Sequence, residues 1–135
     1  MLRALAASTL LMAAACASDE TGAAPPHSGA NHLAGTNWVQ TEPEAAPPPT
    51  IQFEDTRAAG FAGCNRWFAT VTQEGETLRF SQAGATRMAC PEPQMAAEIA
   101  FLSVIENTRY GHYDRDALVL LDEAQTVTAR FERAP

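Results

Sequence analysis

Apolar and polar residues alternate in short runs along most of the chain, a pattern typical of half-buried β-strands. The alternation predicts strands at residues 36–40, 51–53, 67–71, 77–80, 109–113, 118–121 and 127–131. Polar residues and glycine separate these runs and predict turns, for example at 73–75 and at 114–116. The folded part of the chain is therefore expected to be rich in β-structure.

One segment, residues 94–106, has the period of a helix instead. Pro91 and Pro93 stand just before or within its first turn, where proline is tolerated. The apolar side chains at helical spacing are Met95, Ile99, Phe101, Leu102 and Ile105. Strands, one helix and then more strands predict the α+β class: a curled antiparallel β-sheet, an open barrel-like meander, with one helix inserted after the first strands and packed on the sheet.

The N-terminus has the features of an export signal. Arg3 is followed by an apolar stretch, residues 4–15, that is too short to span a bilayer. Three alanines then precede Cys16, which resembles the bacterial lipobox, with Ala13 where leucine is usual. We expect residues 1–15 to be a lipoprotein signal peptide and Cys16 to be lipidated; the alternative is ordinary secretory cleavage nearby.

The predicted tether runs from Cys16 through residue 34 and consists mainly of Ala, Ser, Gly and Pro, which cannot bury enough surface to order it. His27 and His32 lie in this tether and are expected to be incidental. The residue after the cysteine is Ala17 rather than aspartate, which resembles the signal for the outer membrane. The prediction is an exported lipoprotein facing the periplasm, with its domain at residues 35–135.

Charge narrows the classes of partner. The chain carries 9 basic residues, all arginine, and 16 acidic residues, a formal net charge of −7. Binding to nucleic acid or to anionic lipid head groups depends on clustered cationic side chains. Nucleic acid is therefore not expected as a partner, and the membrane partner would be held by the N-terminal lipid anchor.

Two further cysteines, Cys64 and Cys90, lie inside the expected domain. An even pair in an oxidising compartment usually forms a disulfide. Two buried thiols or a redox pair are the alternatives, although no Cys-x-x-Cys spacing is present to tune a thiolate.

Four sequence elements, in order from residue 35 to residue 133, resemble the META domain family, which includes HslJ-like envelope proteins. They are residues 35–38 (GTNW), 60–66 (GFAGCNR), 86–91 (TRMACP) and 118–121 (LVLL). The motif residues are Gly60, Gly63, Cys64, Asn65, Arg66, Thr86, Arg87, Met88 and Cys90.

The resemblance implies a small α+β domain, often carried by bacterial lipoproteins and linked to stress response, antibiotic tolerance or secretion. It implies no established enzymatic activity and no cofactor. A likeness of the fold to lipid-binding pilot proteins of secretion systems is an analogy of fold alone.

The motif residues also have local interpretations. Gly60 and Gly63 are expected in a bulge or tight bend with positive φ, and the Asn65 side chain is expected to cap that turn. Arg66 and Arg87 are expected to bond carbonyls or acids near the bridge, or to grip an anionic ligand.

No catalytic or metal site is predicted. Ser81 and Ser103 lack a neighbouring histidine in sequence, and His112 with Asp114 and Asp116 is expected to be a solvated face rather than a metal site. Of the helix carboxylates, Glu92 is expected to stabilise the first turn and Glu98 to lie on the surface.

Two functional classes remain. The first is a non-enzymatic binding or structural module of the envelope that engages another envelope protein. The second is a carrier of a small apolar ligand or lipid, or a pilot-like accessory of a secretion system. Candidate ligand-lining residues are Trp38, Phe53, Trp67, Phe80 and Phe101, whose alternative role is a packed core.

Overall fold

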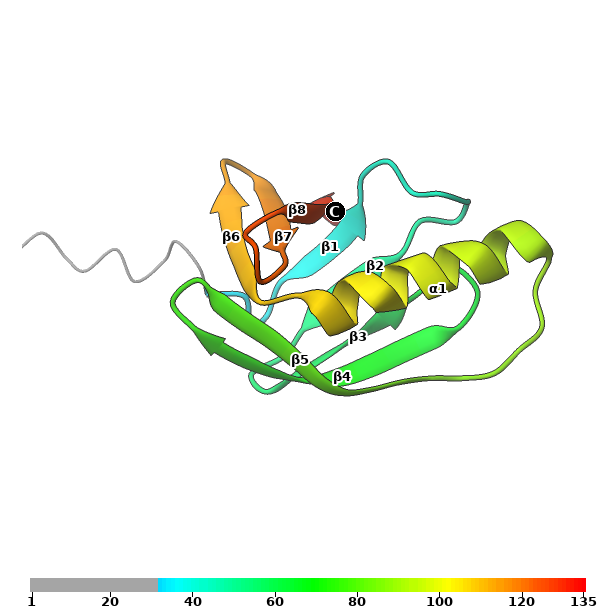
Figure 1. Cartoon of the computed structure of the whole chain (residues 1–135), viewed down its shortest axis with the longest axis horizontal. Helices are drawn as coiled ribbons and strands as arrows, with labels where there is room; N and C mark the ends of the chain where they lie inside the picture. The colour runs from blue at the N-terminus through cyan, green and yellow to red at the C-terminus, as the bar shows by residue number, and fades with distance from the viewer. Residues whose placement is uncertain (1–31) are drawn as a thin grey trace, which may run out of the picture.

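The computed structural model describes residues 32–135, which fold into eight β-strands and one α-helix (Figure 1). The predicted signal peptide, Cys16 and most of the predicted tether lie outside the described residues. The elements are β1 (Asn37–Gln40), β2 (Thr50–Phe53), β3 (Arg57–Phe61), β4 (Arg66–Glu74), β5 (Thr77–Ala85), α1 (Glu92–Asn107), β6 (Tyr110–Asp114), β7 (Ala117–Leu121) and β8 (Val127–Arg133).

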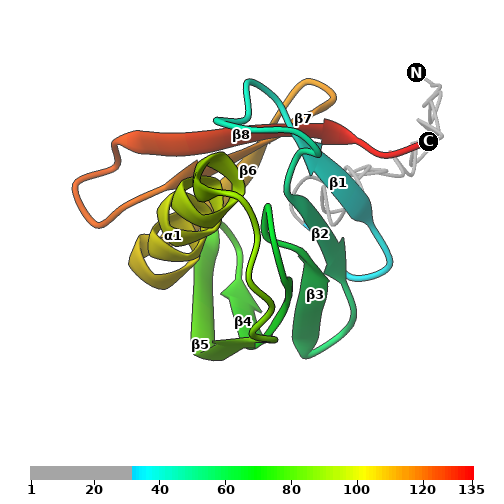
Figure 2. The same cartoon turned by 90° about the vertical axis from the view of Figure 1, so that its right-hand side faces the viewer.

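Each strand pairs antiparallel with the next one along the chain, and β8 returns to pair with β1, so the curled sheet closes on itself (Figure 2). The weakest join is between β5 and β6, where a single pair, Thr77 and Tyr110, is in register. Helix α1 packs against β5 beside this join. The predicted α+β class, the curled antiparallel sheet and the inserted helix are confirmed.

The core fills the inside of the curled sheet. Along β4, buried Trp67, Ala69 and Val71 alternate with exposed residues, as period-two patterning requires. Helix α1 contributes Phe101 and Ile105, which are 2% and 0% exposed. The helix thus supplies part of the core at the side where the strand pairing is thinnest.

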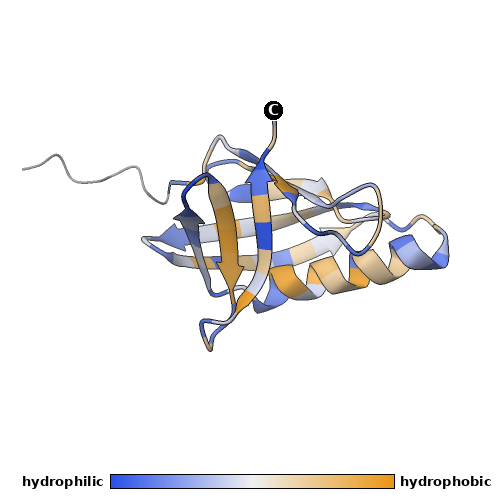
Figure 3. Ribbon diagram, turned by 90° about the horizontal axis from the view of Figure 1, so that it is seen from above, coloured by the Kyte–Doolittle hydropathy of each residue, from blue (hydrophilic) through white to orange (hydrophobic). Residues whose placement is uncertain are grey.

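The helix begins and ends close to its predicted limits. Pro91 is the N-cap residue, Pro93 lies in the first turn, and the amides of Gln94 and Met95 both donate to the Pro91 carbonyl. Hydrophobic residues run along most of its length, with hydrophilic residues at both ends (Figure 3). No helix within residues 32–135 is long and apolar enough to cross a membrane.

Strand β3 is absent from the sequence-based prediction. Its residues include two alanines and Gly60 and contain no β-branched side chain, so the local signal is weak. Gly60 belongs to this strand rather than to a bend. A Cβ at this position would lie 2.1 Å from the carbonyl oxygen of Thr50 on β2, so glycine is required by the close approach of two backbones.

Gly60→Ala is expected to lower the free energy of unfolding by about 2–3 kcal/mol, because the atom that the new methyl meets belongs to the backbone and cannot turn away. Gly84→Ala is the matched control: there the nearest atoms belong to the ring of Phe68, which is 48% exposed and can move. Urea denaturation of both variants measures the difference. Equal losses in the two variants would contradict the explanation for Gly60.

The domain makes ordered contacts upstream of Gly35. Leu33, which lies in the predicted tether, is 2% exposed and belongs to the core cluster. Its carbonyl accepts hydrogen bonds from the amide and the hydroxyl of Thr36, and the Tyr113 hydroxyl donates to the carbonyl of His32.

Candidate functional site

The motif residues from two distant stretches of sequence meet at one junction of the fold. The turn between β3 and β4 holds Gly63, Cys64 and Asn65, and the connection from β5 to α1 holds residues 86–90. The N-terminal half of α1 packs on the same turn, because a Cβ on Gly63 would lie 3.1 Å from the Glu98 amide. We call the contacts among this turn, residues 86–90 and Glu98 the motif junction.

A disulfide crosses the motif junction. Cys64 and Cys90 are bonded, with their Cα atoms 5.9 Å apart and their positions separated by 26 in sequence. Cys64 is 4% exposed. The bond ties the β3–β4 turn to the residue immediately before the helix N-cap, and so limits how far α1 can move from the sheet.

The side chain of Asn65 is the hub of the junction. It is 2% exposed, and its Oδ1 accepts from the Met88 amide at 2.7 Å and from the Thr86 hydroxyl at 3.1 Å. Its Nδ2 donates to the Met88 carbonyl at 3.3 Å and to Oε1 of Glu98 at 3.1 Å. The amide does more than the predicted cap of its own turn: Nδ2 donates to Cys64 Sγ within that turn at 3.3 Å, and the other bonds join two other segments.

Glu98 completes the junction and is not the surface residue that we predicted. It is 9% exposed, and its Oε2 accepts from the Asn65 backbone amide at 2.5 Å. Both carboxylate oxygens therefore have donors from one residue. A buried carboxylate requires such partners, since an unsatisfied one would cost several kcal/mol.

Gly63 has the positive φ that the sequence predicted. Its φ is +116°, a region that L side chains rarely adopt, and α1 lies close against it. Both features require glycine at this position.

The three longest motif side chains are exposed to solvent. Arg66 and Arg87 are exposed, and Met88 is 62% exposed. Among residues 32–135, no hydrogen bond or ion pair joins either guanidinium group to another residue, so the bonds expected near the bridge do not form. The motif thus combines a buried structural part with an exposed cationic and apolar part.

The five candidate ligand-lining residues are 1–8% exposed. Four of them form a chain of ring contacts, with centroids 6.0 Å apart for Phe53 and Phe80, 6.0 Å for Trp67 and Phe80, and 5.3 Å for Trp67 and Phe101. The fifth, Trp38, packs on Tyr113 with ring centroids 5.5 Å apart. This arrangement is that of a packed core, the alternative role considered for these residues.

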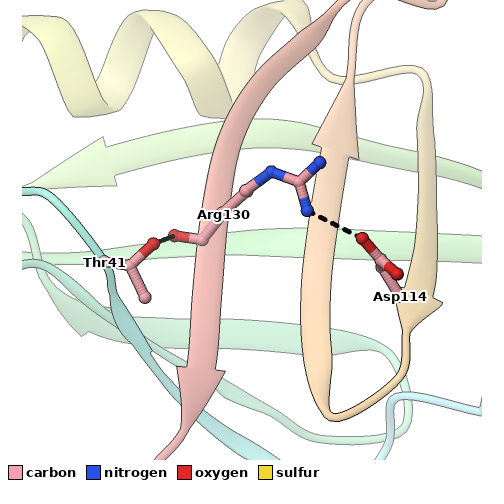
Figure 4. A network of polar contacts seen from close by, with 3 residues as sticks. All are labelled: Thr41, Asp114 and Arg130. Atoms are coloured by element: carbon pink, nitrogen blue, oxygen red, sulfur yellow. Dashed lines mark hydrogen bonds and ion pairs between the residues drawn. The ribbon is translucent and has the colours of Figure 1, made fainter.

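The stretch around His112 offers no metal site. Asp114 bonds to Arg130 with 3.0 Å between Oδ2 and Nη1, and the Arg130 carbonyl accepts from the Thr41 hydroxyl (Figure 4). Both charged side chains are about half exposed, so the pair contributes little stability. No group of three His, Cys, Asp or Glu residues within the described part of the chain is arranged to hold a metal ion.

The serines give no catalytic constellation. Ser81 is exposed on β5, and the Ser103 hydroxyl accepts from the Asn107 side chain within α1. No hydrogen bond joins either serine to a histidine among residues 32–135.

Comparison with known families decides the classification. The model of the META domain matches residues 31–135. This chain belongs to the META domain family. META domains are not known as enzymes. No curated protein matches the chain.

Solved structures share the META fold of this chain. A protein from Burkholderia xenovorans, determined by NMR, is 25% identical with a TM-score of 0.63, and the match covers 76% of this chain and 83% of that one. A second NMR structure is 20% identical, with a TM-score of 0.57 over 74% of this chain and 90% of the other. A DUF4847 family protein from Bacteroides vulgatus is 14% identical, with a TM-score of 0.55 over 74% and 93%.

Proposed function

We propose that this protein is a non-enzymatic META-domain module of the bacterial envelope, attached by a lipid on Cys16 to the outer membrane and facing the periplasm. It acts by binding another envelope component and contributes to stress or antibiotic tolerance. The observation that carries the proposal is the distribution of its cysteines. Cys64 and Cys90 pair inside the domain, and Cys16 follows three alanines at the end of an apolar run.

Disulfides persist in oxidising compartments, and an export signal is the route by which a bacterial chain reaches one. Each methylene of an acyl chain buried in a bilayer contributes about 0.8 kcal/mol, and two or more chains give lasting attachment. The whole chain has a formal net charge of −7, so electrostatic attraction to anionic lipid would not hold the protein on a membrane.

The motif junction supports a non-enzymatic role. Its buried polar atoms bond to one another: the Asn65 amide bonds to Met88, Thr86 and Glu98. With its buried polar groups used inside the motif junction, the domain is proposed to act by binding through its exposed surface.

Intact mass spectrometry of the protein extracted from membranes tests the attachment. The expected mature chain begins at Cys16 and carries the mass of added acyl chains, and it fractionates with the outer membrane. Cys16→Ser is the control and should yield a chain without that mass, released from the membrane. A wild-type chain that either retains an unmodified Cys16 or begins beyond it would overturn the proposal.

A further inference from the structure

The outer face of β1, β2 and β3 holds a cavity, on the opposite side of the domain from α1 (Figure 2). Its volume is about 210 Å³. Four consecutive strands, β1 to β4, contribute to its lining. The lining side chains that matter for binding are Asn37, Thr50, Gln52, Phe61 and Arg66.

The strand register places these side chains on the outer face of the sheet. Asn37 is directly opposite Gln52, and Phe61 is directly opposite Arg66. Directly opposed residues of an antiparallel pair point to the same side, and successive residues of a strand alternate. The tryptophan that follows Asn37 and the one that follows Arg66 are each 1% exposed and face the core. Both opposed pairs therefore face outward.

The polar groups of this face have hydrogen-bonding capacity to spare. Among residues 32–135, no hydrogen bond involves the side-chain amide of Asn37 or of Gln52, and none involves the guanidinium of Arg66. The Thr50 hydroxyl accepts from the Phe61 amide at 3.0 Å, and its own proton has no acceptor in that part of the chain. An amide side chain offers donors and an acceptor together, whereas a guanidinium offers donors alone. The face can therefore bind a ligand that presents both hydroxyl groups and an anionic group.

The paired strands exclude a peptide that binds as an added strand, because β1, β2 and β3 each pair with a strand on both sides. The occupant must contact side chains instead. Within the described part of the chain, Arg66 is the only charged residue that lines the cavity. A phosphate group carries about 1.5–2 negative charges and needs more cationic partners than this. One carboxylate matches a single guanidinium.

The acidic side chains around the cavity lie away from its cationic end. Glu132 is on β8, four strands from the strand that carries Arg66. Glu54 follows β2 directly, at the opposite end of that strand from Thr50. Neither glutamate lines the cavity, and neither forms an ion pair with Arg66. The guanidinium is therefore available to an anionic group of a ligand.

We propose that this cavity binds a carboxylate-bearing sugar. The sugar ring lies against Phe61, and its carboxylate pairs with Arg66. Its hydroxyl groups bond to Asn37, Thr50 and Gln52. This inference rests on the proposed role of the protein as a binding module of the envelope, and it names the class of ligand for that role.

Each contact matches a chemical feature of such a sugar. An aromatic side chain presents a large apolar surface to the C–H groups of the ring. A guanidinium binds a carboxylate in a bidentate, charge-assisted pair. The strands of Gln52 and Arg66 are two apart, about 10 Å at 4.8 Å per strand, and the arginine side chain covers part of that distance. The remaining span suits one sugar residue.

The test is a chemical-shift titration of the isotope-labelled full chain with small sugars. Methyl β-D-glucuronide and methyl β-D-glucoside form a matched pair, because they differ only in a carboxylate or a hydroxymethyl group on the ring. The glucuronide is expected to bind about three- to fivefold more tightly, the gain from one exposed ion pair. The amides that shift should be those of residues 37, 50–52 and 60–66. Acetate, a carboxylate without a sugar, should not saturate these shifts.

A second acidic probe distinguishes two sources of the sugar. N-acetylmuramic acid bears its carboxylate on a lactyl group rather than on the ring. Tighter binding of the glucuronide would support the inference with a polysaccharide rich in uronic acid as the source. Tighter binding of N-acetylmuramic acid would support it with a cell-wall saccharide as the source.

Substitutions locate the contacts. Arg66→Gln should bring the affinity for the glucuronide down to that for the glucoside, because glutamine removes the charge. Arg79→Gln is the matched control and should change neither affinity, since Arg79 is exposed on β5 and does not line the cavity. Asn37→Leu should weaken both sugars about threefold, because it removes a neutral hydrogen-bonding group.

Three results would overturn the inference: no saturable shifts with either acidic probe, binding of acetate as tight as that of the glucuronide, or an Arg66→Gln variant that keeps the preference for the glucuronide. None of these depends on the mass of the mature chain. The lipid attachment can therefore stand while the sugar site fails, and an unmodified Cys16 would leave the sugar titration unaffected.

Discussion

Asn65→Leu is expected to lower the free energy of unfolding by about 4 kcal/mol, the largest effect of any single substitution considered. Leucine is similar in size but removes five hydrogen bonds, which serve Met88, Thr86, Glu98 and Cys64. Each buried bond contributes about 1 kcal/mol and a bond to a charged group more, and the partners left behind remain buried. Urea denaturation at fixed pH measures the loss.

Asn37→Leu is the matched control, because Asn37 is exposed on β1 and its side chain makes no hydrogen bond among the described residues. It should change stability by less than about 0.5 kcal/mol. Similar losses in the two variants would mean that the Asn65 amide is not a hub.

The double substitution Cys64→Ser and Cys90→Ser removes the disulfide and is expected to cause the second large loss in the free energy of unfolding. A cross-link that closes 26 residues is expected to contribute about 3.5 kcal/mol by restricting the unfolded chain. A domain of this size has only about 5–15 kcal/mol in total, so the variant should unfold at much lower urea. The m-value should rise as well, because the unfolded chain exposes more surface without the bridge.

Cys16→Ser is the control for removal of the disulfide. When both proteins are purified without the lipid, the urea midpoint of this variant should match that of wild type. Reduction of the wild-type chain by dithiothreitol should reproduce the double variant. A double variant as stable as wild type would contradict the structural role of the bridge.

Much of the fold follows from patterns within single elements. Helix α1 was predicted as 94–106 and extends over Glu92–Asn107, because its apolar spacing and its prolines are local signals. The strands with alternating β-branched or aromatic residues, such as β4, are equally clear. Strand β3 escaped prediction because alanine and glycine give no such alternation, and its pairing with β2 and β4 supplies the stability that its own sequence lacks.

The motif junction could be predicted only in part. The positive φ of Gly63 follows from its place in a turn, because glycine has a recognisable use there. The roles of Asn65 and Glu98 depend on a contact between residues 33 positions apart, so no local rule distinguishes this glutamate from an exposed one. The one available signal for Glu98 was its position beside the apolar face of the predicted helix.

The central claim is that the META motif works as a structural junction in which Asn65 and Glu98 hold α1 against the sheet. A double-mutant cycle of Asn65→Ala and Glu98→Ala, followed by urea denaturation, tests it most directly. The account predicts a coupling energy of about 1.5–3 kcal/mol, the value for a buried hydrogen bond to a charged group. Losses that add without coupling would contradict it.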